Sequence, residues 1–247
     1  MIEFRGVSKS YDRGGGRHFL KTRLASWLRQ PRADAFHALS NVSFRLTPGN
    51  SLAVIGANGA GMSTLLSLVA GILYPDEGVI TVDGSVAALL ELGSGFHPDL
   101  TGAENIRLNA SLMGLTRKRT AELFDHIVDF SGLSEFIDEP LRLYSSGMSM
   151  RLAFSVAVNV EPDILILDEV FAVGDHAFQE KSFERIRQFK HRGKTLICVS
   201  HSSEILELLC EEALWLDHGR VAGYGAAREV MRAYLAGDFA KMELPLP

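Results

Sequence analysis

Short apolar segments alternate along this chain with longer segments whose apolar residues recur at helical spacing. Residues 51–55 are an apolar run typical of a buried strand, whereas residues 38–46 partly alternate apolar and polar positions, as a half-exposed strand does. The pattern predicts strands at 2–7, 38–46, 51–55, 79–82, 86–90, 164–167, 195–199 and 213–216. It predicts helices at 63–73, 104–113, 117–130, 148–158, 179–191, 203–210 and 227–235. Strands that alternate with helices indicate an α/β fold with a mainly parallel sheet.

The sequence predicts one domain of residues 1–247, since it shows neither an internal repeat nor a long low-complexity tract. Within this domain a helical subdomain is expected at about 95–160, where several helical patterns follow one another. Residues 11–35 are rich in Gly and Arg and are expected to form an irregular insertion, whose basic amphipathic part is 13–35.

The composition limits the class of protein. The chain has 247 residues, of which 47% are hydrophobic and 22% charged, as in a globular protein with a full core. No run of about 18 apolar residues predicts a membrane-spanning helix, and the N-terminus lacks the apolar core of a signal peptide. Cys198 and Cys210 form no CxxC pair, which favours a reducing cytosol over a structural zinc site. The net charge of −5 gives no sign of a general nucleic-acid-binding surface.

That net charge hides a basic insertion. Residues 13–33 contain six Lys and Arg residues and no acidic residue, so this segment carries +6 and the rest of the chain sums to −11 (−5 − 6). Four apolar residues of the segment fall on one face of a helix: Leu20, Leu24, Trp27 and Leu28. A basic amphipathic helix with Trp suits a cytoplasmic membrane surface or the foot of a membrane partner. The alternative is a solvated loop whose apolar residues pack on the domain.

A glycine-rich loop joins the predicted strand 51–55 to the predicted helix 63–73. It follows the P-loop pattern G-x-x-x-x-G-K-[ST], except that Met62 replaces the lysine. Glycines let backbone N–H groups surround a phosphate, and the helix start adds partial positive charge. The alternative is a glycine-rich turn without a ligand. The candidate nucleotide-binding residues are Gly56, Ala57, Asn58, Gly59, Ala60, Gly61, Met62, Ser63 and Thr64, of which Ser63 would coordinate Mg²⁺.

Two carboxylates, Asp168 and Glu169, follow the buried strand 164–167. Asp168 at the strand tip can hold the Mg²⁺ shell through water, and Glu169 can accept a proton from an attacking water. Two acids that merely cap a strand are the alternative. We expect this strand to neighbour the P-loop strand, which favours the functional interpretation.

Two more features add candidate residues. Residues 143–151 predict a helix that starts with small residues, which is an anion site by the same argument or, alternatively, an ordinary serine N-cap. The residues concerned are Ser145, Ser146 and Gly147. His201 follows the predicted strand 195–199, 32 residues after Glu169 (201 − 169), and a loop or core histidine is its alternative.

These four features, in this order and spacing, resemble the ATP-binding cassette (ABC) family of transporter ATPases. Residues 144–148, Tyr-Ser-Ser-Gly-Met, are similar to the LSGGQ motif of that family. The resemblance covers essentially the whole chain and is strongest to the branch that energises export of capsular polysaccharide, O-antigen or teichoic acid. Further support comes from residues 91–102, 104–106 and 171–175. The resemblance implies a P-loop NTPase fold with a mainly parallel core sheet, an antiparallel β part and a helical subdomain.

The resemblance also implies roles for the matching residues. The candidates for stacking on adenine are Tyr11 and, as substitutes after the insertion, Phe36 or His37. The residues implied to bind Mg²⁺, directly or through water, are Ser63, Asp168 and Glu91. Glu91 stands at a position where the family usually carries glutamine. The remaining roles are those of Glu169 as general base, His201 as the γ-phosphate contact and Asp175 in the loop that links two sites.

An assembly is implied in the same way. Such cassettes pair head to tail, so Ser145, Ser146 and Gly147 would close on ATP bound to the other subunit of a homodimer. The homodimer would serve two copies of a separate transmembrane permease at the cytoplasmic face of the cytoplasmic membrane, and a lipid-linked polysaccharide would pass through the permease. No nucleic-acid partner is expected. The last predicted helix ends near Leu235, so we expect no C-terminal carbohydrate-binding domain.

Met62 changes the activity that this resemblance implies. Methionine has about the length of lysine but no charge and no strong donor, so it cannot neutralise charge on the β- and γ-phosphates. We expect weak nucleotide binding and very slow hydrolysis of ATP. A regulatory or structural module that binds nucleotide without hydrolysing it is the alternative function. A cassette that acts on nucleic acid or ribosomes is disfavoured, because the chain shows neither a second cassette nor a long coiled coil.

Overall fold

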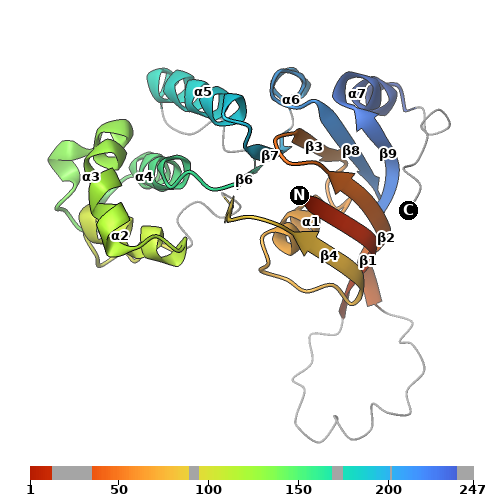
Figure 1. The fold of residues 1–247 in the computed structure, drawn as a ribbon, viewed down its shortest axis with the longest axis horizontal. Helices are drawn as coiled ribbons and strands as arrows, with labels where there is room; N and C mark the ends of the chain where they lie inside the picture. The colour runs from red at the N-terminus through yellow and green to blue at the C-terminus, as the bar shows by residue number, and fades with distance from the viewer. Residues whose placement is uncertain (13–34, 89–94, 169–174, 201, 238–247) are drawn as a thin grey trace, which may run out of the picture.

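The computed structural model describes residues 1–12, 35–88, 95–168, 175–200 and 202–237 (Figure 1). Its larger sheet contains β3 (Ser51–Gly56), β5 (Val86–Ala88), β6 (Ile164–Asp168), β7 (Thr195–Val199), β8 (Glu212–Asp217) and β9 (Arg220–Ala226). These strands lie in the order β5-β6-β7-β3-β8-β9, and all neighbours are parallel except β8 and β9.

The smaller sheet is antiparallel and has the order β2-β1-β4. Its strands are β1 (Ile2–Asp12), β2 (Ala35–Leu46) and β4 (Glu77–Val82). A mainly parallel sheet beside an antiparallel one confirms the α/β fold that the sequence predicts.

The central strands of the larger sheet are buried on both faces, which is why they appear in the sequence as continuous apolar runs. In β3, Leu52 and Val54 belong to the core shared with the smaller sheet and α1 (Met62–Val69). Ala53 and Ile55 point to the opposite face and pack in the core beneath three helices. Those helices, at the top of Figure 1, are α5 (His176–His191), α6 (Ser203–Leu209) and α7 (Ala227–Ala236).

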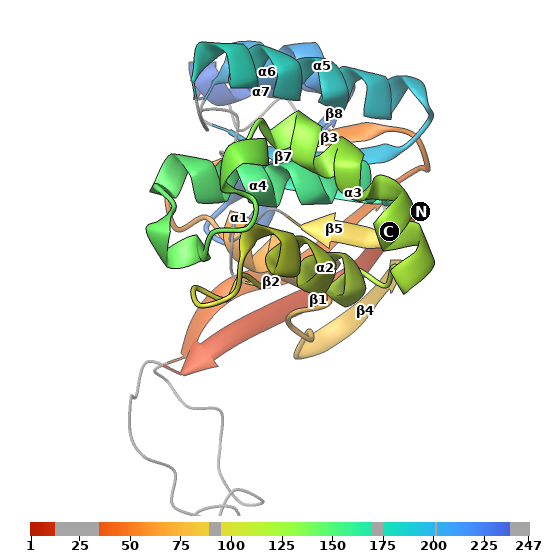
Figure 2. The same ribbon diagram turned by 90° about the vertical axis from the view of Figure 1, so that its left-hand side faces the viewer.

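Three helices form a separate group on the left of Figure 1, and Figure 2 shows this group in front of the strands. They are α2 (Gly102–Leu112), α3 (Arg117–Ser131) and α4 (Ser146–Asn159), and two short 3₁₀ turns, Ser134–Phe136 and Leu141–Leu143, lie between α3 and α4. Their apolar faces meet in a core of their own that includes Ile106, Ile127 and Leu152. The helices lie where the sequence predicts a helical subdomain, at about 95–160.

Two differences from the predicted element boundaries bear on the site. Tyr11 is not in an irregular insertion, because β1 continues to Asp12 and keeps its pairing with β2, opposite Phe36. Most of the predicted insertion, 13–34, lies outside the described residues. The helix predicted at 63–73 ends at Val69, and the chain turns at Gly71, which has a φ of +71°.

The strand β9 was not predicted at all. Its sequence, Arg-Val-Ala-Gly-Tyr-Gly-Ala, is poor in β-branched residues, so it carries little local strand signal. The strand forms because it pairs with β8 in a hairpin and because the Tyr224 hydroxyl donates to the Arg45 carbonyl in β2 at 2.7 Å. Tertiary contacts therefore outweigh propensity in this segment.

Candidate functional site

The loop between β3 and α1 is held against β2 and β8 through its main chain. Gly61, the N-cap residue of α1, has a φ of +106°, and a Cβ there would collide with the carbonyl oxygen of Ala38. Gly219, which follows β8, donates to the Ala60 carbonyl at 3.0 Å and accepts from the Ser40 N–H at 2.8 Å. Glycine at 61 is therefore required both by the backbone conformation and by the close approach of β2.

The start of α1 carries no side-chain cap, because its N-cap residue is a glycine. Within the helix, the first backbone bond runs from the Leu65 N–H to the Gly61 carbonyl at 2.9 Å, which leaves the N–H groups of the first turn for another acceptor. Such N–H groups, together with the partial positive charge of a helix start, bind phosphate. The local structure fits the predicted P-loop.

A cavity of about 530 Å³ lies at this helix start. It is lined by Phe36, Ala38, Asn58, Gly59, Gly61, Met62, Ser63, Thr64, Asp168 and Val199, but not by the P-loop candidates Gly56, Ala57 and Ala60. The prediction that β6 neighbours β3 is wrong, because β7 lies between them. Asp168 still reaches the cavity, since parallel strands end at a common edge of the sheet, where ligands of such sheets bind.

Three aromatic or imidazole side chains are candidates for stacking on adenine, and the structure places them differently. Phe36 lines the cavity and is 40% exposed. Tyr11 pairs with Phe36 across β1 and β2 but does not line the cavity. The Nδ1 atom of His37 lies 2.9 Å from the hydroxyl of Ser10, also away from the cavity lining. Of these three side chains, Phe36 alone lines the cavity.

The oxygen donors at the cavity fit a Mg²⁺ ion bound together with nucleotide. Ser63 is exposed in the first turn of α1, Asp168 ends β6, and both residues line the same cavity. The described parts of the chain contain no cluster of three acidic, His or Cys side chains that would hold a metal without nucleotide. Mg²⁺ usually takes one or two protein oxygens and completes its shell with phosphates and water. Three further predicted residues, Glu91, Glu169 and His201, lie outside the described residues.

The predicted anion site at 145–147 is the start of α4. Ser145 is the N-cap residue, and its hydroxyl accepts from the Met148 N–H at 3.1 Å. The ordinary N-cap interpretation is therefore correct for Ser145. Ser145 and Ser146 are exposed, and neither lines the cavity at α1 in the same chain.

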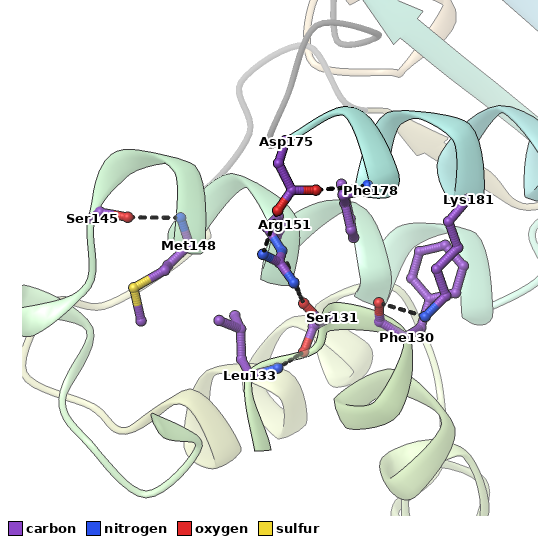
Figure 3. Close-up of polar contacts among 9 residues, drawn as sticks. All are labelled: Phe130, Ser131, Leu133, Ser145, Met148, Arg151, Asp175, Phe178 and Lys181. Carbon is purple, nitrogen blue, oxygen red and sulfur yellow. Dashed lines mark hydrogen bonds and ion pairs between the residues drawn. The ribbon is translucent and has the colours of Figure 1, made fainter. Parts of the chain in front are cut away.

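Asp175 begins α5 and is joined to α4 by a residue that the sequence analysis missed, Arg151 (Figure 3). Oδ1 of Asp175 accepts from the Phe178 N–H at 2.9 Å, and Oδ2 lies 3.6 Å from Nη1 of Arg151. Arg151 follows the motif at 144–148 by three residues, but nothing in the sequence shows that it contacts Asp175. That contact depends on how α4 and α5 pack.

Met62 is the first residue of α1 and occupies the position of the P-loop lysine. Its side chain is half-buried, lines the cavity and packs against the core between the two sheets. A thioether is only a weak acceptor and donates no hydrogen bond. The cavity wall is therefore apolar where a P-loop lysine would reach the phosphates.

Comparison with known proteins identifies close relatives. The family described as ABC transporter matches residues 39–172. The O-antigen export system ATP-binding protein RfbB of Klebsiella pneumoniae is 52% identical over 197 residues, which are 80% of this chain and 80% of that protein. The teichoic acids export ATP-binding protein TagH of Bacillus cereus is 39% identical over 95% of this chain and 42% of that protein.

Solved structures share the fold at low sequence identity. An ATP-binding cassette dimer bound to ADP and Pi, in a post-hydrolysis state, has a TM-score of 0.74 at 20% identity, covering 92% of this chain and 99% of that chain. The ATP-binding subunit of an ABC transporter has a TM-score of 0.76 at 23% identity, covering 98% and 95%. At this level of identity the likeness concerns the fold alone.

Proposed function

This chain belongs to the ABC transporter family, and we propose that it is the ATP-binding, ATP-hydrolysing subunit of an exporter of O-antigen or a related lipid-linked polysaccharide. The names of its relatives, which export O-antigen or teichoic acids, support this substrate class. One observation carries the proposal: a single cavity is lined by the uncapped start of α1, including Ser63, and by Asp168 at the end of β6.

Hydrolysis of ATP requires that the phosphates are held, that their charge is neutralised and that a water is oriented. In the proposed site the first-turn N–H groups of α1 hold the phosphates, and Phe36 stacks on the base. Mg²⁺, held by Ser63 and Asp168, would supply positive charge beside the phosphates. We propose that Glu169 accepts the proton of the attacking water and that His201 contacts the γ-phosphate.

We also propose that two copies of the chain pair, each closing α4 on the ATP of the other. Support comes from Ser145 and Ser146, which are exposed and do not line the cavity of their own chain. With Gly147, they present a helix start whose partial positive charge suits the γ-phosphate of a second copy. Asp175, at the start of α5, would lie near the junction of the two sites.

The membrane partner is a further part of the proposal. No helix in the described ranges is both long and apolar enough to cross a bilayer. We therefore assign transport to two copies of a separate permease and place this subunit at the cytoplasmic face of the cytoplasmic membrane. A groove of about 710 Å³ between α2 and α3, lined by both apolar and polar residues including Leu108, Phe124, Arg107 and Arg117, supports a protein contact there. We assign the basic segment 13–35 to the membrane side.

Met62 favours a second candidate function, a subunit that binds nucleotide but does not hydrolyse it. The observation behind it is the apolar cavity wall at the lysine position. Loss of a charge-assisted contact costs about 1.5–3 kcal/mol of binding, before any further loss in the transition state. The same residue would therefore lower both ATP affinity and turnover.

The test compares the purified full-length chain with its Met62→Lys variant and, as a matched control, Met62→Leu. We expect Met62→Lys to raise ATP affinity about 10–100-fold and the rate of phosphate release by a larger factor, because lysine restores the charged contact. Met62→Leu keeps the size and lacks the charge, so it should change neither. ATP binding without turnover in the Met62→Lys protein would favour the second candidate function.

A second experiment tests the partner. A tagged full-length chain should co-purify with a membrane subunit encoded beside it, and cells that lack the chain should lose the polysaccharide from their surface. Recovery of RNA in place of a membrane subunit would contradict the proposed function.

A further inference from the structure

The Tyr144 hydroxyl ties the residue that precedes the N-cap of α4 to an earlier part of the chain. Its Oη atom donates to the Phe136 carbonyl at 2.6 Å. Burial raises the pKa of Tyr144, and the nearby charges of Asp138 and Glu139 raise it further, so the hydroxyl stays a donor at neutral pH. Because Ser145, the N-cap residue of α4, follows directly in the chain, this bond holds the main chain at the point where the helix begins.

Gly102, the first residue of α2, leaves the space that this hydroxyl occupies. A Cβ at position 102 would collide with Oη of Tyr144 and would lie 3.0 Å from the Ile137 carbonyl oxygen. Gly102 has a negative φ, so the space around it, and not its backbone conformation, excludes a side chain. The position of the hydroxyl therefore requires glycine at 102.

Main-chain hydrogen bonds join the same two parts of the chain. The Leu141 N–H donates to the Leu100 carbonyl at 2.9 Å, and the Ala103 N–H donates to the Ile137 carbonyl at 2.8 Å. The segment that leads into α4 is therefore fixed against the first turn of α2. Tyr144 extends this contact with its side chain as far as the residue next to the N-cap of α4.

The position of the α4 start matters because its N–H groups are the ones that we assign to phosphate. The first main-chain bond of α4 runs from the Ser149 N–H to the Ser145 carbonyl at 3.0 Å, and the Ser145 hydroxyl accepts from the Met148 N–H. The N–H groups of Ser146 and Gly147 are thus left for an acceptor outside the helix. Electrostatic stabilisation of a reacting phosphate depends on donors that are in place before charge develops. A small displacement of this helix start should therefore lower turnover more than it lowers binding.

The hydroxyl contributes little to the folding of α4. The helix packs in the core that it shares with α2 and α3, where Ile106, Ile127 and Leu152 are fully buried. Its first turn is closed by the Ser145 cap. Loss of one hydroxyl should therefore leave the helix folded and loosen only the direction in which its first turn points.

We infer that Tyr144 is a positioning residue, whose hydroxyl fixes the start of α4 so that the N–H groups of Ser146 and Gly147 meet the γ-phosphate bound by a second copy. This inference rests on the proposed function. The LSGGQ motif has leucine where this chain has Tyr144, so the bond to Phe136 is a property of this chain and not of the motif. The inference predicts that loss of the hydroxyl leaves ATP binding by one chain intact and lowers turnover by the pair.

The chain offers a matched control in Tyr224 of β9. Its hydroxyl also donates to a main-chain carbonyl, that of Arg45 in β2, at 2.7 Å, and burial also raises its pKa. Tyr224 is half-buried like Tyr144, but it neither lines the cavity nor lies beside α4 in the chain. Any effect of Tyr144→Phe that Tyr224→Phe reproduces is a general effect of losing a hydroxyl.

The first experiment uses the full-length chain with Met62→Lys and measures ATP affinity, kcat, KM and, by analytical ultracentrifugation, ATP-dependent pairing. We expect Tyr144→Phe to lower kcat about tenfold and to weaken pairing about fivefold or more, because the donors are no longer held in place. The affinity of one chain for ATP should change less than about twofold, and Tyr224→Phe should change neither kcat nor pairing by more than that.

Mixing of chains gives a readout that a merely structural role would not move. In the proposed pair each site takes α1 from one copy and the start of α4 from the other. The chain with both Met62→Lys and Tyr144→Phe is mixed with an excess of the unmodified chain, so that one site combines lysine at position 62 with Tyr144. Turnover should rise about fivefold or more above that of the doubly substituted chain alone. An excess of chain that carries only Tyr144→Phe should give no such rise.

Gly102→Ala tests the geometry at the hydroxyl. In the presence of Tyr144 the added methyl group meets Oη, so we expect a loss of kcat. Tyr144→Phe removes that contact while the close approach to Ile137 remains, so Gly102→Ala should lower kcat by a smaller factor in that background. Equal factors in the two backgrounds would contradict the placement of the hydroxyl against Gly102.

Different failures overturn different statements. If Tyr144→Phe and Tyr224→Phe change kcat and pairing equally, or if the unmodified chain restores no turnover, the positioning role of Tyr144 is wrong while ATP binding by the chain stands. If the Met62→Lys chain binds ATP without turnover, the effect of Tyr144→Phe on pairing decides the matter in the same way. If the chain binds no ATP with either Met62 or lysine at that position, the proposed function is wrong, and this inference is wrong with it.

Discussion

The two ends of the six-stranded sheet are built differently, although the same strands run through both. At the carboxyl end, Gly61 leaves the start of α1 without a side-chain cap, and a cavity lies over it. At the amino end, Asp163 accepts from the Ser85 N–H and hydroxyl at 3.0 and 2.9 Å and pairs with Lys194 at 2.7 Å. Several polar groups at the amino end are paired within the chain, whereas the carboxyl end carries the uncapped helix start and the cavity.

This difference indicates a division between stability and function. The amino end contains further hydrogen bonds. The Asn50 side-chain amide donates to Glu212 at 2.6 Å, and the Gly49 N–H donates to the Thr195 hydroxyl at 2.9 Å. Substitutions at that end should therefore change the free energy of unfolding without changing the affinity for nucleotide. Changes at the carboxyl end should affect nucleotide binding first, except where the backbone itself is disturbed.

The largest effect is expected from Gly61→Ala at the carboxyl end. A Cβ at φ +106° is strained and collides with the Ala38 carbonyl, so we expect a loss of about 3 kcal/mol or more in the free energy of unfolding and loss of ATP binding. Urea unfolding and equilibrium ATP binding are the measurements. Gly71→Ala is the control, because Gly71 also has a positive φ but has open space around it and lies outside the cavity. It should cost about 1 kcal/mol and leave binding intact.

A smaller effect, on binding alone, is expected from Phe36→Ala. Stacking of a base on an aromatic ring is worth about 1–3 kcal/mol, so ATP affinity should fall about 5–100-fold with little change in unfolding. Tyr11→Ala is the matched variant on the facing strand, and we expect less than about a twofold loss of affinity. Titration with a fluorescent ATP analogue measures both. The reverse order of the two losses would assign the adenine contact to Tyr11.

The smallest effect is expected at the amino end, from Asp163→Asn. Lys194, together with Ser85, holds the pKa of Asp163 well below its usual value, so the folded protein favours the charged carboxylate. Asp163 is largely exposed, so we expect a loss of only about 1 kcal/mol at neutral pH and no change in ATP affinity.

The pH dependence of this loss has a definite sign. Because the pKa of Asp163 is lower in the folded than in the unfolded state, its contribution is complete above the usual aspartate pKa of about 3.9. The difference between the unmodified chain and D163N should therefore shrink as the pH falls below about 4. A difference that stays constant down to pH 2 would show that the charge of Asp163 does not stabilise the fold.

Local sequence patterns predict the parts of this molecule that are determined locally. The apolar runs at 51–55 and 164–167 correspond to β3 and β6, because strands buried on both faces need apolar residues throughout. The loop at 56–64 is predictable because a phosphate-binding turn requires glycine at fixed positions. The start of α4 is predictable for a similar reason, since a helix start favours serine.

The features that the sequence does not predict depend on contacts between distant segments. The position of β7 between β3 and β6 is a property of strand order, which no local pattern encodes. Phe36 lines the cavity and its cross-strand partner Tyr11 does not, because β2 is the strand that approaches the P-loop, where Ala38 lies against Gly61. Arg151 is an ordinary helix residue until α5 packs against α4 and brings Asp175 near it.

The contact of Gly61 with Ala38 has a consequence for the size of the ligand. Ala38 lies two residues from Phe36 on β2, so the ends of the cavity that we propose to bind the base and the phosphates are joined by one close main-chain approach. The length of nucleotide that fits is then set by backbone packing and does not depend on the side chain at position 62. Substitution of Met62 should change the affinity for adenine nucleotides. It should not change which nucleotide length, from the adenine ring to the terminal phosphate, binds best.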